Sequence, residues 1–162
     1  MPLILADRGY DVWMGNNRGT EYSRGNSKGL DPSMQEFWAW SWAEMGIYDD
    51  VANINMIKEK TGKDKIFYIG YSQGTVQMFY GLIKKGKEIS DSLHKYVALA
   101  PCTVAGEATI VPDIENTLFK LQGLGIYATF NTPSWHDDLK KICKELSAEY
   151  CLSLQEQTIA GS

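Results

Sequence analysis

The stretch Lys65-Ile66-Phe67-Tyr68-Ile69-Gly70-Tyr71-Ser72-Gln73-Gly74-Thr75 decides the fold of this chain. Four consecutive apolar residues begin at Ile66 without polar alternation, and such a run predicts a β-strand buried on both faces. The glycine-containing residues 70–74 then break the strand. A helix is predicted directly after them, with an apolar face and a lysine-rich end. The residues on that face are Val76, Phe79, Tyr80 and Ile83.

The segments on either side continue the same pattern. A helix is predicted before the central strand, because apolar residues recur there at helical spacing up to Thr61-Gly62. Those residues are Ile47, Val51, Ile54 and Ile57. Asp49 and Asp50 near its start suit the positive end of the helix dipole. Further strands are predicted at 11–15 and 95–100. Alternating strands and helices predict an α/β fold with a parallel sheet covered by helices.

Composition places the chain among ordinary globular domains. It has 162 residues, of which 44% are hydrophobic and 22% charged, with a net charge of −4. The acidic balance argues against a nucleic-acid partner. No apolar run reaches the roughly 18–20 residues of a membrane helix, so we expect no transmembrane segment. The first residues lack the basic segment of a signal peptide.

Residues 70–74 match the pattern G-x-S-x-G, which places a serine on a sharp turn between a strand and a helix. A serine hydroxyl is a weak nucleophile and must be held where a base can reach it. Ser72 is therefore the predicted nucleophile. The backbone N–H of Gln73 is the predicted oxyanion donor. Gly70 and Gly74 lack Cβ atoms, so strand and helix are expected to approach closely around the turn.

The base that such a serine needs is not evident in this chain. His94 immediately precedes the strand predicted at 95–100, so we expect it in a surface loop at the end of the sheet opposite Ser72. The order Ser72, Asp113, His136 is formally allowed. His136 and the acids after it read more simply as the start of a helix.

Several blocks of sequence resemble the acid lipase family of α/β-hydrolases, the gastric and lysosomal group. They occur in the order of that family over residues 3–101, and they are far more specific than the serine motif alone. The blocks are Leu5–Gly19, the aromatic segment Phe37–Met45 with Tyr48-Asp49, Gly70–Thr75 and Ala98–Pro101. Tyr71 departs from the family, which usually has histidine at that position of the elbow.

The resemblance implies a partial α/β-hydrolase fold. Residues 1–102 would form the central part of the core, and residues 103–162 an incomplete cap-like lid region. The catalytic aspartate and histidine are then expected outside this chain, beyond residue 162, and the second oxyanion donor before Met1. The family often has a close cysteine pair in its cap. Cys143 and Cys151 fit that position, although their spacing alone leaves a disulfide and ordinary thiols open.

The function implied by this resemblance is hydrolysis of neutral lipid esters through an acyl-enzyme on Ser72. We expect no cofactor, no metal and a lipid ester substrate, with a secreted or lysosomal location implied by the family. The cluster Trp38/Trp40/Trp42 is either core packing or a contact with lipid, and the Asn16–Gly19 turn either shapes the pocket or is plain turn chemistry. Two alternatives remain open: an inactive hydrolase-like binding protein, and another elbow enzyme such as a thioesterase, acyltransferase or peptidase.

Overall fold

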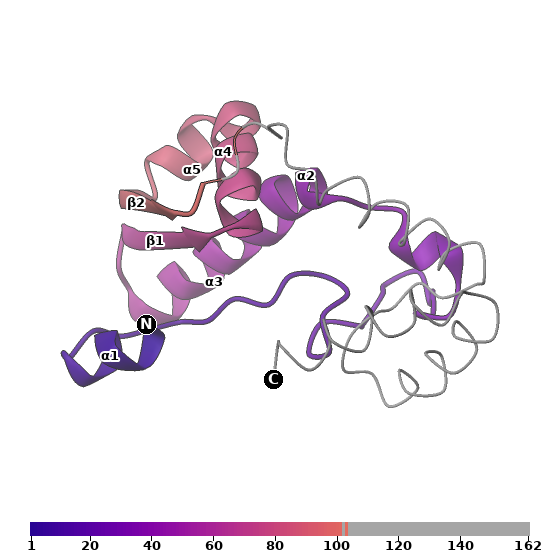
Figure 1. Ribbon diagram of the computed structural model, residues 1–162, viewed down its shortest axis with the longest axis horizontal. Coiled ribbons are helices and arrows are strands. Elements are labelled where there is room, and N and C mark those ends of the chain that lie inside the picture. The colour runs from indigo at the N-terminus through magenta and orange to yellow at the C-terminus, as the bar shows by residue number, and fades with distance from the viewer. Residues whose placement is uncertain (102, 104–162) are drawn as a thin grey trace, which may run out of the picture. The chain divides into compact units, whose positions relative to one another are not determined.

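The computed structural model describes residues 1–101 and 103. They belong to two compact units, one with Met1–Gly25 and the residues from Ala39 onward, the other containing Asn26–Trp38. The first unit holds both strands and the longer helices (Figure 1). Its elements are α1 (Pro2–Asp7), α2 (Trp42–Glu44), the π-helical turn η2 (Met45–Asp49), α3 (Asp50–Thr61), β1 (Ile66–Tyr71), α4 (Gln73–Lys85), α5 (Lys87–Ser90) and β2 (Leu93–Leu99). The second unit contains the 3-10 turn η1 (Gln35–Trp38).

The strands β1 and β2 form a parallel pair, joined by the crossover through α4 and α5. The register runs from Ile66 opposite Leu93 to Tyr71 opposite Leu99. Both strands therefore end at the same edge of the sheet, as parallel strands joined by a helix must. The predicted α/β class is confirmed. Strand β2 begins two residues earlier than the predicted residue 95.

Only one face of this sheet is covered by the described helices. On β1 the side chain of Tyr68 is half-buried, whereas Phe67, Ile69 and Tyr71 on the other face are 59%, 40% and 70% exposed. The prediction of a strand buried on both faces is therefore wrong for the described residues. An unbroken apolar run shows that both faces suit an apolar neighbour, but it does not identify that neighbour.

The core lies where three helices meet the covered face. Ile54 of α3, Met78 of α4, Ile89 of α5 and Leu93 of β2 form one buried cluster. Complete burial of a side chain such as Met78 stabilises the fold by about 2 kcal/mol. The predicted face of α3 is confirmed at Ile54, which is 2% exposed.

The predicted face of α4 is wrong at Ile83, which is 77% exposed, whereas Val76, Phe79 and Tyr80 are half-buried. The fully buried positions of this helix are Thr75, Gln77, Met78 and Gly81. Three of these four residues are small or polar, and two of them, Gln77 and Gly81, lie directly against the backbone of η2. A Cβ at Gly46 would collide with the carbonyl oxygen of Gln77, and one at Gly81 would lie 2.7 Å from the carbonyl oxygen of Gly46. Side-chain polarity alone does not reveal such a close backbone contact.

The helical segment begins earlier than predicted. Ser41 caps α2 through a reciprocal arrangement, in which its backbone N–H donates to Glu44 Oε2 at 2.8 Å and its Oγ accepts from the N–H of Ala43. Asp49 and Asp50 therefore lie inside a continuous helical run and not at its first turn. Each acid also has a specific partner, Arg18 for Asp49 and the pair Tyr68 and Gln77 for Asp50. The predicted stop at Gly62 is confirmed by its φ of 67°.

The strand predicted at 11–15 does not form. Among the described residues β1 and β2 pair only with each other, and 11–15 has no neighbouring strand to receive its hydrogen bonds. The aromatic segment is divided between the two units. In the second unit, Phe37 is buried and Trp38 Nε1 donates to the carbonyl of Pro32 at 2.7 Å. In the first unit, Trp42 packs edge-on against Tyr80 and stays 43% exposed.

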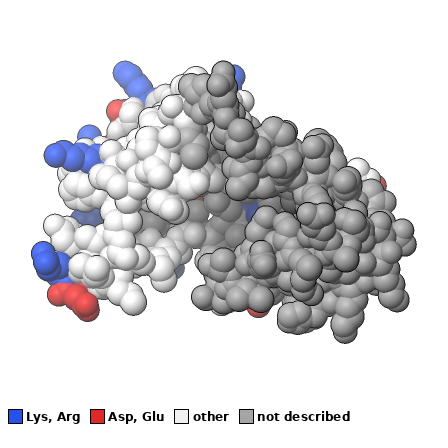
Figure 2. Space-filling model, viewed as in Figure 1, with Lys and Arg blue, Asp and Glu red and all other residues white. Residues whose placement is uncertain are grey.

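The face of the described residues seen in Figure 2 is mostly uncharged, with charged side chains of both signs at its rim. No helix in the described part is both long and apolar enough to span a membrane.

Candidate active site

Ser72 occupies a sharp turn between the last residue of β1 and the first residue of α4. Its φ and ψ are 51° and −117°, a backbone conformation that L-residues rarely adopt. Holding a non-glycine residue there costs about 1–3 kcal/mol, and such strain persists mainly where a function requires it. Ser72 is half-buried at the carboxyl end of the sheet. In open α/β sheets this is the end where ligands bind.

Hydrogen bonds fix the backbone of Ser72 on both sides. Its N–H donates to the carbonyl of Leu99 at 3.0 Å, which ties the turn to the end of β2. Its carbonyl accepts from the N–H of Thr75 at 2.9 Å and from the Thr75 hydroxyl at 2.6 Å. Thr75 is completely buried. The turn is thus anchored in the sheet and in the first turn of α4, so its position is set by the core.

The two motif glycines play different roles. A Cβ at Gly70 would lie 2.5 Å from the carbonyl oxygen of Gly74 and 3.1 Å from the nitrogen of Thr75. The expected close approach is therefore real at Gly70. At Gly74 a Cβ would meet nothing within 4 Å, so the expectation is wrong there. Tyr71 lies between Gly70 and Ser72, on the exposed face of the sheet, with its side chain 70% exposed.

Gln73 is the first residue of α4, so its N–H is one of the first-turn donors that a helix leaves unpaired. Its side-chain amide contacts the sulfur of Met45 at 3.1 Å. This side-chain contact ties the start of α4 to η2. The oxyanion role of the Gln73 N–H stays a prediction.

His94 lies inside β2 and not in a loop before it, which corrects the expected local structure. It sits near the start of the strand, where its ring packs against Phe67 with 5.3 Å between centroids. Ser72 bonds to Leu99 at the other end, and five residues of strand span about 17 Å. His94 therefore cannot reach Ser72. Asp113, His136, Cys143 and Cys151 lie outside the described residues.

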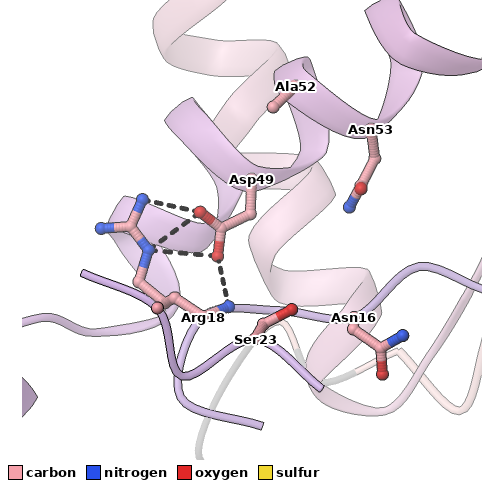
Figure 3. A pocket seen from close by; sticks show the side chains of 7 residues that line it. Asn16, Arg18, Ser23, Asp49, Ala52 and Asn53 are labelled. Carbon is pink, nitrogen blue, oxygen red and sulfur yellow. Dashed lines mark hydrogen bonds and ion pairs between the residues drawn. The ribbon is translucent and has the colours of Figure 1, made fainter. Parts of the chain in front are cut away.

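The turn at Asn16–Gly19 packs against η2 and α3. The guanidinium of Arg18 binds both carboxylate oxygens of Asp49, at 2.6 Å and 3.1 Å, and its backbone N–H donates to the same carboxylate at 2.9 Å (Figure 3). A cavity of about 390 Å³ opens beside this pair, and Asn16, Ser23 and Asn53 also line it. The turn thus borders a cavity that Ser72 does not line, and its role in shaping the substrate pocket stays a prediction.

We predict that Asp49→Asn lowers the free energy of unfolding by about 1–2 kcal/mol, because it removes a paired, two-oxygen acceptor that is mostly buried. Glu88→Gln is the matched control, since Glu88 faces Lys85 at 3.3 Å on the surface, and it should cost less than about 0.5 kcal/mol. Urea unfolding of both variants provides the measurement. Equal losses of unfolding free energy in the two variants would contradict a special stabilising role of the Arg18–Asp49 pair.

The sequence analysis does not predict a buried polar cluster that lies beside the turn carrying Ser72. Asp50 is 2% exposed, and its Oδ1 accepts from Gln77 Nε2 at 2.9 Å and from the Tyr68 hydroxyl at 3.1 Å. Gln77 in turn bonds to Asn17 at 2.9 Å. The available signal was positional: Asp50 lies three residues after Ile47 and four before Ile54, on the apolar face of its helix.

The described residues contain no group of three or more histidine, cysteine, aspartate or glutamate side chains placed to hold a metal ion.

Comparison with known proteins identifies the family and the relatives that this chain resembles. Residues 2–132 match the family described as alpha/beta hydrolase fold. The chain is 48% identical over 99 residues to lipase lipl-5 of Caenorhabditis elegans, which covers 61% of the chain and 24% of that protein. It is 39% identical over 148 residues to triacylglycerol lipase 2 of Arabidopsis thaliana, covering 88% of the chain and 34% of the relative.

A third relative is the lysosomal acid lipase/cholesteryl ester hydrolase of Macaca fascicularis, 47% identical over 99 residues, covering 61% of the chain and 24% of that protein. The chain thus spans about a quarter to a third of the length of these relatives. Together with the strand–Ser72–helix turn and the parallel strands, these matches show that the chain belongs to the α/β-hydrolase fold family and is similar to its acid lipases.

Proposed function

We propose that this chain carries the nucleophile of a serine hydrolase acting on lipid esters, and that Ser72 is that nucleophile. The observation that carries the proposal is the backbone of Ser72, held at a positive φ between β1 and α4 at the carboxyl end of parallel strands. Strain of this kind presents the serine hydroxyl away from the strand and above the helix N-terminus. The lipase names of the relatives support the substrate class.

In the proposed reaction, Ser72 Oγ attacks the ester carbonyl as a base removes its proton. The carbonyl π electrons move to oxygen, and the N–H of Gln73 stabilises the negative charge there. Collapse of this intermediate expels the alcohol, which receives the proton from the base, and leaves an acyl group on Ser72. Water then attacks the acyl-enzyme by the same route and releases the fatty acid.

We propose that the base and its orienting acid come from outside this chain. Two features support this: His94 lies a strand length from Ser72, and the matched residues cover only 24% to 34% of the length of the relatives. We further propose that residues 1–102 belong to the hydrolase core and residues 103–162 to a cap. The exposed ring of Trp42 is a candidate contact with the lipid surface.

Substrate profiling of the protein at its natural length tests the proposal. Rates with p-nitrophenyl esters of short and long acyl chains would be compared with an acyl thioester and a peptide anilide. We expect the long-chain esters to be hydrolysed fastest. Faster turnover of the thioester or the anilide would favour another elbow enzyme, and no turnover of any substrate would favour an inactive binding protein.

A further inference from the structure

Four side chains from four segments meet in a buried polar cluster beside the turn that carries Ser72. We name it the Asp50 cluster: Asn17, Asp50, Tyr68 and Gln77. Asp50 and Gln77 are 2% and 4% exposed. One oxygen of Asp50, Oδ1, accepts hydrogen bonds from Tyr68 on β1 and from Gln77 on α4. This carboxyl group therefore joins the strand that enters the turn to the helix that leaves it.

The cluster reaches the turn through short covalent and hydrogen-bonded paths. Tyr68 lies four residues before Ser72, and its hydroxyl is 3.4 Å from the carbonyl oxygen of Gly74, two residues after it. Gln77 lies one helical turn after Gln73. Because β1 and α4 continue directly into Ser72, a shift of either element would move the serine hydroxyl.

We infer that Asp50 is a positioning residue for Ser72, which it serves by holding β1 and α4 together through Tyr68 and Gln77. The inference deepens the proposed function and rests on it, since it concerns the placement of the proposed nucleophile. It does not make Asp50 part of the reaction, because the hydrogen bonds of its carboxylate go to Tyr68 and Gln77 and not to Ser72.

The charge state of Asp50 decides how well it can hold β1 and α4 together. Its second oxygen, Oδ2, is buried without a partner among the described residues. Burial raises the pKa of Asp50 to about 6, against the opposing effect of the bonds from Gln77 and Tyr68. Asp50 is thus neutral in acid and charged at neutral pH, and a charge without full partners is costly in the interior.

The ionisable groups around Asp50 are few. On its own helical run, neighbouring Asp49 raises the pKa of Asp50 further, and Asp49 is itself bound by Arg18 of the preceding turn. From β1 the phenol of Tyr68 faces it, with a pKa raised by burial and by Asp50, so it stays protonated as a donor. From β2 the phenol of Tyr96 faces it, also with a raised pKa. Helix α4 faces it with the uncharged amide of Gln77.

Hydrogen exchange reports how firmly the backbone of the turn is held, and it does not require catalysis. The N–H of Ser72 bonds to Leu99 at one end of the sheet, and the N–H of Ile66 bonds to Ser92 at the other, both at 3.0 Å. Asp50→Val removes the shared acceptor and should speed exchange of the Ser72 amide about tenfold, with less than about threefold change at Ile66. Equal acceleration at both amides, or none at Ser72, would overturn the inference.

A gentler variant keeps the test decisive if Asp50→Val does not fold. Asp50→Asn keeps the acceptor oxygen and removes the charge, whereas Glu59→Gln removes an exposed carboxylate from the same helix. A raised pKa means that the folded state holds the proton more tightly than the unfolded state, so stability falls as pH rises from about 4 to about 6. The rise of the pKa of Asp50 from 3.8 to about 6 corresponds to a roughly 100-fold rise in the unfolding constant over this pH range.

Urea unfolding across this range should show the rise in the unaltered protein and in Glu59→Gln, and not in Asp50→Asn. Protection of the Ser72 amide should fall over the same range, except in Asp50→Asn. The same pH dependence in all three proteins would overturn the inference.

The reactivity of Ser72 separates this inference from the proposed function. In the protein at its natural length, Asp50→Val should slow the maximal rate of modification by a fluorophosphonate about tenfold, with little change in reagent affinity, and Asp50→Asn should restore it. A change confined to affinity would overturn the positioning role. A protein in which Ser72 never reacts refutes the proposed function, while the exchange and unfolding results still decide whether Asp50 positions the turn.

Discussion

Replacing Ser72 with glycine is expected to stabilise the protein and to abolish its hydrolysis of esters. Glycine adopts the observed φ of 51° without the strain of about 1–3 kcal/mol that serine bears there. The extra freedom of glycine in the unfolded chain costs about 0.4–1 kcal/mol. The free energy of unfolding should therefore rise by about 1 kcal/mol, while turnover falls by about 10³-fold or more because the nucleophile is gone.

Ser72→Ala is the matched variant, because it removes the same hydroxyl and keeps the Cβ that causes the strain. It should lose activity to the same extent and gain no stability. Chemical denaturation and ester turnover, measured on both variants, test the two effects separately. Substantial residual activity in either variant would contradict the role of Ser72, and a glycine variant less stable than the serine protein would contradict the strain.

Replacing Gly70 with alanine is expected to destabilise the protein by about 3 kcal/mol or more, comparable to overpacking a core. The new Cβ would lie 2.5 Å from the carbonyl oxygen of Gly74 and 2.8 Å from its carbon. Both atoms belong to the backbone at the start of α4, which cannot move without moving Ser72. Activity should fall together with stability.

Gly74→Ala tests this explanation within the same motif. A Cβ at Gly74 meets open space, and alanine favours a helix over glycine by about 0.5–1 kcal/mol. This variant should therefore be as stable as the unaltered protein or slightly more so. Thermal unfolding of the two variants is the measurement. Similar losses in both would show that the motif needs glycine for a reason other than the contact between Gly70 and Gly74.

The sequence predicts the strand, the turn and the helix around Ser72 because their signals are local. A run of apolar residues, a glycine-bounded turn and a helical apolar spacing all lie within twenty residues. Side-chain contacts between distant segments leave no such local signal. The bonds of Asp50 with Tyr68 and Gln77 span 18 and 27 residues, and only the three-dimensional fold brings these groups together.

The errors have a common physical origin. Apolar patterns report which side chains suit burial, but not which element is present to cover them. Phe67 and Ile69 have the pattern of a doubly buried strand and are exposed among the described residues. Residues 11–15 have the pattern of a strand and have no strand beside them within the described part of the chain. On α4, the apolar Ile83 is exposed, whereas Gly81 lies directly against the backbone of Gly46.

Identification of the residue that reacts with a fluorophosphonate tests the central claim most directly. The protein at its natural length would be treated with the reagent, digested with trypsin and analysed by mass spectrometry. The peptide of residues 66–84 contains Ser72 as its single serine. We predict that the phosphonyl group lies on Ser72 and disappears in Ser72→Ala. An unmodified Ser72, or a modification that survives this substitution, would contradict the claim.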